Sequence, residues 1–282
     1  MDEFRWFGCR LDSQFKHLRI VGLSDVHYGN PYCSTKHFKK AVQFVADNPD
    51  VYCIFVGDLC ESTIKTSKGE IYKQVGTPQK QRDWFIEEAL IPLKGKILGM
   101  TSGNHENRIL NEVGIDISED IAKAYKVPYR AEGILLKIKF GNGNNRVAGK
   151  PYVFWSYFTH GYGGARTKSA KAVKAERLAA WIYADIYGMA HDHVVNVAPN
   201  VFLMPDERGT INEKTGFETG KVTAHRAMLI KTNSFIKWGG YSEILGFPPS
   251  DLYTPIIYLL TPQSEYWETL IERPCKAIRV MV

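Results

Sequence analysis

The sequence lacks three features that would place the protein outside the soluble globular class. No apolar run approaches the roughly 18 residues that span a bilayer. Residues 1–6 do not have the pattern of a signal peptide. No polar low-complexity stretch indicates disorder. We therefore expect a folded cytoplasmic protein without a membrane partner.

Cysteine is scarce, and its number is odd. Five cysteines argue against a disulfide framework, and Cys9, Cys33 and Cys275 stand at no metal-binding spacing. Cys53 and Cys60 lie on either side of Asp58, and we interpret them as packed side chains. All five are expected to be reduced thiols.

Apolar residues and basic charge are plentiful instead. The 282 residues are 44% hydrophobic and carry a formal net charge of +6, which allows a substantial core and a polyanionic partner. We expect one domain over residues 1–282. Residues 232–282 have no interpretable periodicity and are expected to form a C-terminal extension that packs on the core or at an oligomer contact.

Apolar segments and helical patterns alternate along the chain. Short runs rich in branched residues, at 19–24, 51–56, 97–102 and 152–158, are typical of buried strands. Residues 36–46, 79–90 and 117–125 have helical spacing, and turn residues multiply beyond His193. The pattern predicts an α/β fold with four layers, in which two mixed sheets are flanked by helices.

Polar motifs follow these strands, where open α/β sheets bind their ligands. Four such motifs are Asp25-Val26-His27, Gly57-Asp58, Gly103-Asn104-His105-Glu106 and Thr159-His160-Gly161, and a fifth, His191-Asp192-His193, lies further along the chain. Each is weak evidence alone, because a single histidine is more often a core or surface residue than a ligand. Together they offer imidazole, carboxylate and amide groups, which suit Mn²⁺, Fe or Zn²⁺.

In this order the motifs resemble the calcineurin-like metallophosphoesterase superfamily over residues 19–193, closest in character to its phosphodiesterase and DNA exonuclease branch. The resemblance implies two divalent cations, Mn²⁺ first, with Fe, Zn²⁺ or Mg²⁺ as alternatives. It also implies that Asp25, His27 and His193 hold one cation and that Asn104, His160 and His191 hold the other, with Asp58 between them. A hydroxide bridging the cations would attack the phosphorus in line.

The resemblance leaves His105 for acid and base chemistry. It implies that His105 protonates the leaving alkoxide or orients the phosphate, and a histidine in this role needs an anionic partner that raises its basicity. Glu61 is the candidate, because related protein phosphatases carry an aspartate at that spacing after Asp58. The alternative is that Glu61 is a surface carboxylate.

Some positions depart from the family pattern. Residues 57–63 lack the phosphate-gripping arginine of the protein phosphatases, and Arg108 is either a substitute clamp or an ordinary helix-surface residue. Glu106 discriminates little between branches. Ala190 replaces the usual glycine before the last two histidines, which need a bend to point the same way, and Gly188 is consistent with one.

The segment after His160 suggests the substrate. Residues 161–168 are flexible and basic, and the candidate substrate-binding residues there are Tyr162, Arg166 and Lys168. They lead into a predicted helix with Lys171 and Lys174, whose charges and amino terminus would attract nucleic-acid phosphates. The alternative is a solvated helix face.

Three functions remain open at this point. The first is a nuclease that cleaves phosphodiester bonds, and it is the leading interpretation. The second is a phosphomonoesterase or Ser/Thr protein phosphatase that uses the same metals. The third is a scaffold that kept the fold and lost the chemistry, which the full set of candidate ligands disfavours.

Overall fold

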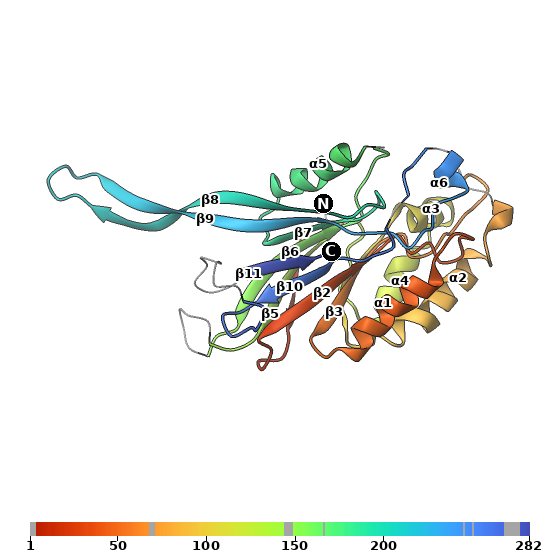
Figure 1. Ribbon diagram of the computed structural model, residues 1–282, viewed down its shortest axis with the longest axis horizontal. Coiled ribbons are helices and arrows are strands. Elements are labelled where there is room, and N and C mark those ends of the chain that lie inside the picture. Colours follow the sequence, from red (N-terminus) through yellow and green to blue (C-terminus); the bar gives the residue numbers. More distant parts are fainter. Residues whose placement is uncertain are drawn as a thin grey trace.

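Two β-sheets pack face to face in the computed structural model, with helices on both outer sides (Figure 1). The structure describes residues 4–67, 71–143, 149–165, 167–244, 246–249, 251–267 and 277–282. This arrangement confirms the predicted α/β class with two mixed sheets.

The first sheet has five strands in the order β11-β10-β2-β3-β4. Their bounds are β11 (Ala277–Met281), β10 (Ile256–Leu260), β2 (His17–Leu23), β3 (Val51–Val56) and β4 (Ile97–Thr101). Strands β2, β3 and β4 are parallel, so their carboxyl ends share one edge. Strand β10 runs antiparallel between β2 and β11, and the stretch 232–282 therefore supplies two strands of this sheet.

The second sheet has six strands in the order β1-β5-β6-β7-β9-β8. Their bounds are β1 (Trp6–Arg10), β5 (Ile134–Phe140), β6 (Tyr152–Thr159), β7 (Ile186–Met189), β8 (Asn196–Ile211) and β9 (Glu218–Lys231). Strands β6, β7 and β9 are parallel neighbours. Strand β8 pairs antiparallel with β9 at the edge of the sheet.

Helices cover the outer faces unequally. Those beside the first sheet are α1 (Thr35–Asp47), η1 (Ile71–Lys73), α2 (Pro78–Phe85), the π-helix η2 (Ile86–Leu90), α3 (Asn104–Val113) and α4 (Ile117–Tyr125). Helix α5 (Lys168–Ala179) covers the second sheet, and α6 (Tyr241–Ile244) is a single turn. The helix predicted over 79–90 is thus divided into α2 and η2.

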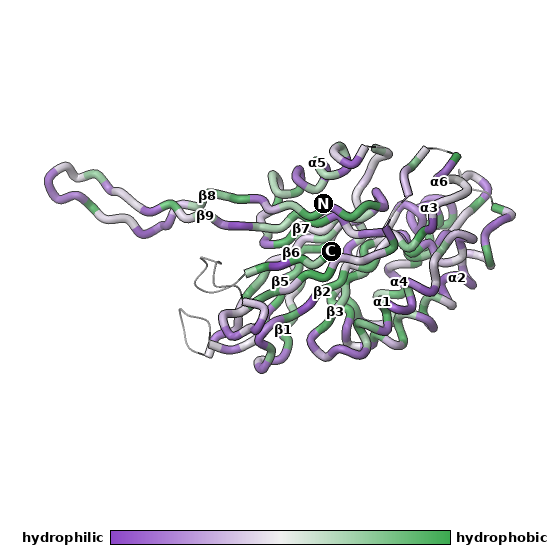
Figure 2. Tube along the Cα trace, in the orientation of Figure 1, coloured by the Kyte–Doolittle hydropathy of each residue, from purple (hydrophilic) through white to green (hydrophobic). Residues whose placement is uncertain are grey.

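A core shared by both sheets lies between them. Ile20 and Ile54 of the first sheet pack in one buried cluster with Phe154, Phe158 and Ile186 of the second. Strand β5 alternates buried and partly exposed residues, as expected for a strand with one face on this core. Figure 2 shows hydrophobic segments gathered in the sheets and hydrophilic ones on the outer helices.

Strands β8 and β9 continue well beyond the body as a long two-stranded arm (Figure 1). Most of the arm is exposed, and Leu203 and Phe217 each keep 75% of their surface accessible. Beyond His193, where turn residues multiply in the sequence, the structure thus has two long antiparallel strands that reach away from the sandwich.

Two expectations from composition can be compared with the described residues. Cys9, Cys33, Cys53 and Cys60 are free thiols, and Cys275 lies outside the described residues. Within the described part of the chain, no helix combines the length and the apolar character needed to cross a bilayer.

Candidate metal centre

The parallel strands β2 and β3 bring the first two motifs together. The Asp25 amide donates to the carbonyl of Gly57 at 3.1 Å, and the His27 amide donates to the carbonyl of Asp58 at 3.0 Å. The third motif approaches so closely that a Cβ on Gly103 would lie 2.2 Å from the Asp58 amide nitrogen. Only glycine fits at this position, because backbone and side-chain atoms of Asp58 occupy the space.

The second sheet supplies the remaining donors across the interface. His160 follows β6, and His191 and His193 follow β7. The His191 amide donates to Asp25 Oδ2 at 3.1 Å, which ties the loop after β7 to the loop after β2. Residues 166 positions apart in the sequence therefore meet at the common edge of both sheets.

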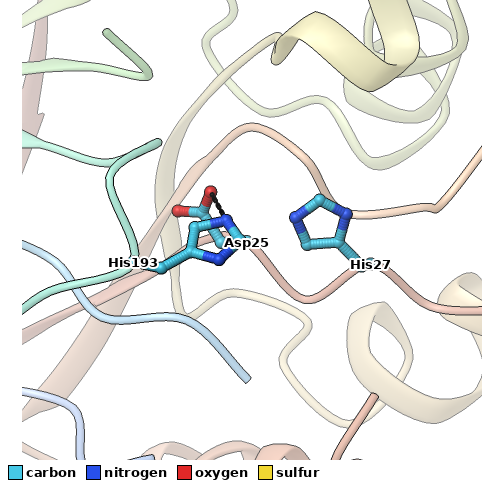
Figure 3. A group of neighbouring side chains, drawn as sticks. All are labelled: Asp25, His27 and His193. Carbon is cyan, nitrogen blue, oxygen red and sulfur yellow. Dashed lines mark ion pairs between the residues drawn. The ribbon is translucent and has the colours of Figure 1, made fainter. Parts of the chain in front are cut away.

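One group of donor atoms consists of Asp25, His27 and His193 (Figure 3). One ligand atom from each lies within 4.8 Å of the other two, and His193 Nε2 is 3.1 Å from Asp25 Oδ1. The carboxylate is completely buried, and the His27 ring is nearly so. This spacing suits a single cation held by the three side chains.

A second group consists of Asp58, His160 and His191. One ligand atom from each again lies within 4.8 Å of the other two. His160 Nε2 is 3.2 Å from Asp58 Oδ2. The Asn104 amide oxygen lies 2.9 Å from His191 Nδ1 and 3.1 Å from His160 Nε2. Asn104 therefore joins this group.

Asp58 connects the two groups. Its Oδ2 atom is 3.2 Å from the His160 ring on one side and 3.8 Å from His27 Nε2 on the other. The structure therefore brings all seven sequence-predicted ligands around one shared space. Their individual metal-binding roles stay predictions.

Ring orientation supports cation binding. His27 Nδ1 lies 3.1 Å from a Glu61 carboxylate oxygen, His160 Nδ1 lies 2.9 Å from the Val56 carbonyl, and His191 Nε2 lies 2.5 Å from the Gly163 carbonyl. Because these oxygens accept, each ring donates there and turns its other nitrogen toward the shared space. Metal-ligating histidines are usually fixed in this way.

Two buried polar atoms at the centre have no hydrogen-bond partner. They are Asp25 Oδ1, which has only the ion pair with His193 among the described residues, and His27 Nε2, and both belong to the first group. Leaving a buried acceptor unsatisfied costs about 1–3 kcal/mol, and more for a charged group. A cation placed between them would satisfy both atoms, so the residues fit a metal.

Backbone strain is concentrated in the same loops. In the described chain, five of the seven non-glycine residues with positive φ are candidate ligands, namely Asp25 (48°), His27 (50°), Asp58 (50°), His191 (72°) and His193 (52°). Such conformations cost on the order of 1–3 kcal/mol each and persist only where the surroundings impose them. The bends aim neighbouring side chains into one space.

Gly188 does not provide the bend predicted for the last motif. It lies within β7, where a Cβ would come 2.2 Å from the Phe158 ring, so its role is close packing. The change of direction occurs at His191 and His193 themselves.

Charges in the centre are strongly coupled. Burial would lower the pKa of His27, but its hydrogen bond to Glu61 and the charge of Asp58 outweigh burial and raise the pKa to about 9. Burial would also lower the pKa of His160, but the negative charge of Asp58 outweighs burial and raises this pKa to about 10. Cation binding at neutral pH must therefore displace protons from both rings.

Glu61 is buried, so the alternative of a surface carboxylate is wrong. The predicted partnership with His105 is present as a long ion pair of 3.7 Å, and the hydrogen bonds of the carboxylate go to other residues. The carboxylate bonds to His27, while Asn30 Nδ2 and Thr63 Oγ1 each donate to it at 3.0 Å. Burial raises its pKa, but these contacts, led by His27, lower it to about 2. Glu61 orients a candidate metal ligand.

His105 has a main-chain partner instead. Its Nδ1 lies 2.7 Å from the Glu61 carbonyl, whereas the Glu61 carboxylate is 3.7 Å away. Its Nε2 faces Asp58 Oδ2 at 3.9 Å, and distances also permit a donor group with His27 and Asp58. Burial lowers the pKa of His105 to about 4 against the attraction of Asp58, contrary to the expected rise in basicity.

Glu106 positions the loop that carries Asp58, a role that the family resemblance did not indicate. It is buried, and its carboxylate accepts hydrogen bonds from four backbone amides, those of Asp58, Leu59, Cys60 and Gly103. Its place at the third position of α3 is a familiar capping position, which could have indicated this use. The contacts fix the loop that carries Asp58.

Three of the four predicted substrate-binding residues lie in the described part of the chain. Arg108 is partly exposed and donates to Ser67 Oγ at 3.3 Å, while Tyr162 and Lys168 are exposed. Arg166 lies outside the described residues.

The burial of two lysines on α5 contradicts the expectation that their charges attract nucleic-acid phosphates. Lys171 and Lys174 are buried and bound to Asp192, so they do not form a basic surface. Asp192 stands between the two last ligands and could have been noticed in the sequence. The buried Lys231, which also contacts it, carries no local signal.

Comparisons with known proteins add little. No family model matches the chain, and no curated protein matches it either. Among solved structures, one similar chain is a conserved uncharacterized protein, described as a predicted phosphoesterase, from Streptococcus pneumoniae TIGR4. It has 11% identity and a TM-score of 0.36, and the match covers 86% of this chain and 83% of that one. A likeness this low carries no argument about function.

Proposed function

We propose that this protein is a metal-dependent phosphoesterase of the calcineurin-like type that hydrolyses phosphodiester bonds, with nucleic acid as substrate. The observation that carries the proposal is the convergence of seven nitrogen and oxygen ligands on one space, with three rings oriented by outer acceptors. Titratable groups with perturbed pKa values cluster at functional sites, which supports a catalytic role for this centre.

The donor set suits a pair of divalent cations. Imidazole nitrogens with carboxylate and amide oxygens favour Mn²⁺, Fe or Zn²⁺, and we expect Mn²⁺. When bound, such a pair supplies Lewis acidity toward a phosphoryl oxygen and a nucleophile at neutral pH.

His105 is the group that we assign to proton transfer. Its ring is held by the Glu61 carbonyl, and its second nitrogen faces the centre. A substrate phosphate placed there would favour the protonated ring, because a nearby negative charge raises the pKa of a histidine. The imidazolium would then give its proton to the leaving oxygen.

Nucleic acid is favoured by the residues that remain exposed beside the centre. Tyr162 follows His160 closely and offers 47% of its surface, enough for a base to stack on its ring. Lys168 begins α5 and is also exposed. Both lie in the segment that connects a candidate ligand to the amino terminus of that helix, where phosphates bind well.

A phosphomonoesterase, including a Ser/Thr protein phosphatase, is the second candidate. It is favoured by the burial of Lys171 and Lys174, which removes two cations from the surface that nucleic acid would contact. Arg108 lies near enough that its charge contributes to lowering the pKa of His105. A guanidinium beside His105 could hold a terminal phosphate.

An activity panel with Mn²⁺ separates these functions. Single-stranded DNA, duplex DNA, RNA, a phosphopeptide and a simple aryl phosphodiester are compared, with the Asp58→Asn variant as a blank. Cleavage of a nucleic acid that weakens as salt rises supports the nuclease. Activity on the phosphopeptide alone favours the second candidate. If the protein holds two cations and hydrolyses none of these substrates, the proposal that it is an enzyme is rejected.

A further inference from the structure

A buried cluster of four charged residues lies directly behind the loop of His191 and His193. It consists of Asp192 and three lysines, Lys171, Lys174 and Lys231, and none exposes more than 8% of its surface. Two lysines come from neighbouring turns of α5, and the third is the last residue of β9. Elements that are remote in sequence thus converge on the residue between two candidate ligands.

The ammonium groups hold the loop at its side chain and at its main chain. Lys174 Nζ donates to Asp192 Oδ1 at 2.6 Å, and Lys231 Nζ forms an ion pair with Oδ2 at 2.7 Å. Lys231 Nζ also donates to the carbonyl of Ala190 at 2.8 Å, and Lys171 Nζ donates to the carbonyl of Asp192 at 2.9 Å. Carbonyls on both sides of His191 are therefore fixed.

The fixed segment is strained. The Asp192 amide donates to the Ala190 carbonyl at 2.9 Å, and His191 between them has a φ of 72°. This is a γ-turn with a positive central φ, the rarer and more strained of the two forms. The carbonyl that closes the turn is the same one that accepts from Lys231. A strained turn persists only where its surroundings impose it.

Electrostatics alone does not explain the cluster. Three ammonium groups face one carboxylate, so the excess positive charge lies close to a centre that has to bind cations and opposes that binding. Stability alone does not explain it either, because apolar residues of similar volume often replace buried ion pairs without loss. What the lysines supply, and apolar residues cannot, is directional hydrogen bonding to the carbonyls beside a ligand.

We propose that Lys171, Lys174 and Lys231 are positioning residues, which act through Asp192 and the adjacent carbonyls to hold His191 and His193 in ligand geometry. The inference rests on the proposed metal centre. His191 belongs to one donor group and His193 to the other, so this one loop controls both cation positions.

The test compares Lys231→Met with a matched core variant. Methionine keeps most of the buried stem and removes the ammonium group. Ile230→Ala, one residue earlier in β9, destabilises the core between the sheets and leaves the ammonium contacts of Lys171, Lys174 and Lys231 in place. Binding of Mn²⁺ alone is followed by electron paramagnetic resonance, which counts free ion and detects coupling between two bound ions, on protein that circular dichroism shows to be folded.

We expect Lys231→Met to weaken Mn²⁺ binding about 10–100-fold, the usual effect of removing a group that orients a ligand, and to lose the coupling signal. Ile230→Ala should bind two ions as the parent does. Lys174→Met serves if Lys231→Met does not fold, with the same expectation. Unchanged binding in the folded lysine variant, or an equal loss in Ile230→Ala, would overturn the positioning role.

The outcomes also separate this inference from the proposed function. If the parent protein binds two Mn²⁺ ions but cleaves no phosphoester, the function fails while the effect of Lys231→Met still decides the positioning role. If the parent protein binds no Mn²⁺, both are wrong. If it binds and cleaves normally while Lys231→Met does the same, only the positioning role is wrong.

Discussion

The two ends of strand β9 differ as much as any two regions of this molecule. The carboxyl end is buried and finishes at Lys231, against the strained loop of the candidate metal centre. The amino-terminal half lies in the arm, where nearly every residue is exposed. One regular strand thus joins a densely bonded region to an exposed arm, in which it pairs with strand β8.

Charge distinguishes the two ends as well. The arm residues 201–226 carry four acidic and four basic side chains, so the arm has no net charge to attract a polyanion. At the metal centre, oppositely charged groups are buried together and shift one another's pKa. The difference teaches that strand geometry alone does not make a site: strained loops and buried partners at the strand ends do.

The largest expected effect comes from the residue that joins both donor groups. Asp58→Asn keeps the size of the side chain but removes the negative charge between the two donor groups. We expect affinity for divalent ions to fall by more than about 100-fold, the upper range found for groups that only orient a ligand. Metal analysis after Mn²⁺ loading measures this. Asp206→Asn in the arm is the control, and an equal loss there would contradict the comparison.

His105→Asn should separate chemistry from binding. Because His105 faces the centre without being one of the seven predicted ligands, we expect metal occupancy to stay nearly intact while turnover slows by about 10²–10⁴-fold. Turnover at saturating substrate and metal content are measured on the same sample. Full activity would refute the proton-transfer role, and loss of metal would indicate that His105 is itself a ligand.

Glu106→Gln tests the support of the Asp58 loop. A glutamine loses the charge and one acceptor, while four backbone amides still point at the side chain. We expect a loss of about 2–4 kcal/mol in the free energy of unfolding of metal-free protein, measured with urea. Glu112→Gln, at an exposed position of the same helix, should change stability by less than about 0.5 kcal/mol.

The smallest effect is expected from shortening the arm. Residues 203–224 are replaced by Asn-Gly, so that the paired residues Phe202 and His225 flank a two-residue turn. Since most arm side chains are exposed, the free energy of unfolding should change by less than about 1 kcal/mol. Metal content and hydrolysis of the aryl phosphodiester should also be unchanged. A large loss of metal would show that the two ends of β9 are coupled.

Sequence patterns predicted the candidate ligands better than the residues that hold these ligands in place. Asp25 and Asp58 were predictable because each follows an apolar strand, and parallel strands end at one edge. The partner of Glu61 was not, because the choice between His27 and His105 depends on side-chain directions in a bent loop. The burial of Lys174 was not predictable either. Its charge suggested a position on the surface, but its ammonium group is buried and donates to Asp192.

The sequence alone determined the fold class and the types of ligand available, since strand periodicity and residue chemistry are local properties of the chain. Tertiary structure alone decided which ring nitrogen faces the centre, which carboxylate supports which histidine, and which lysines are withdrawn from solvent. These depend on contacts between residues far apart in the chain, such as Lys231 and Ala190, whose encounter no local pattern records.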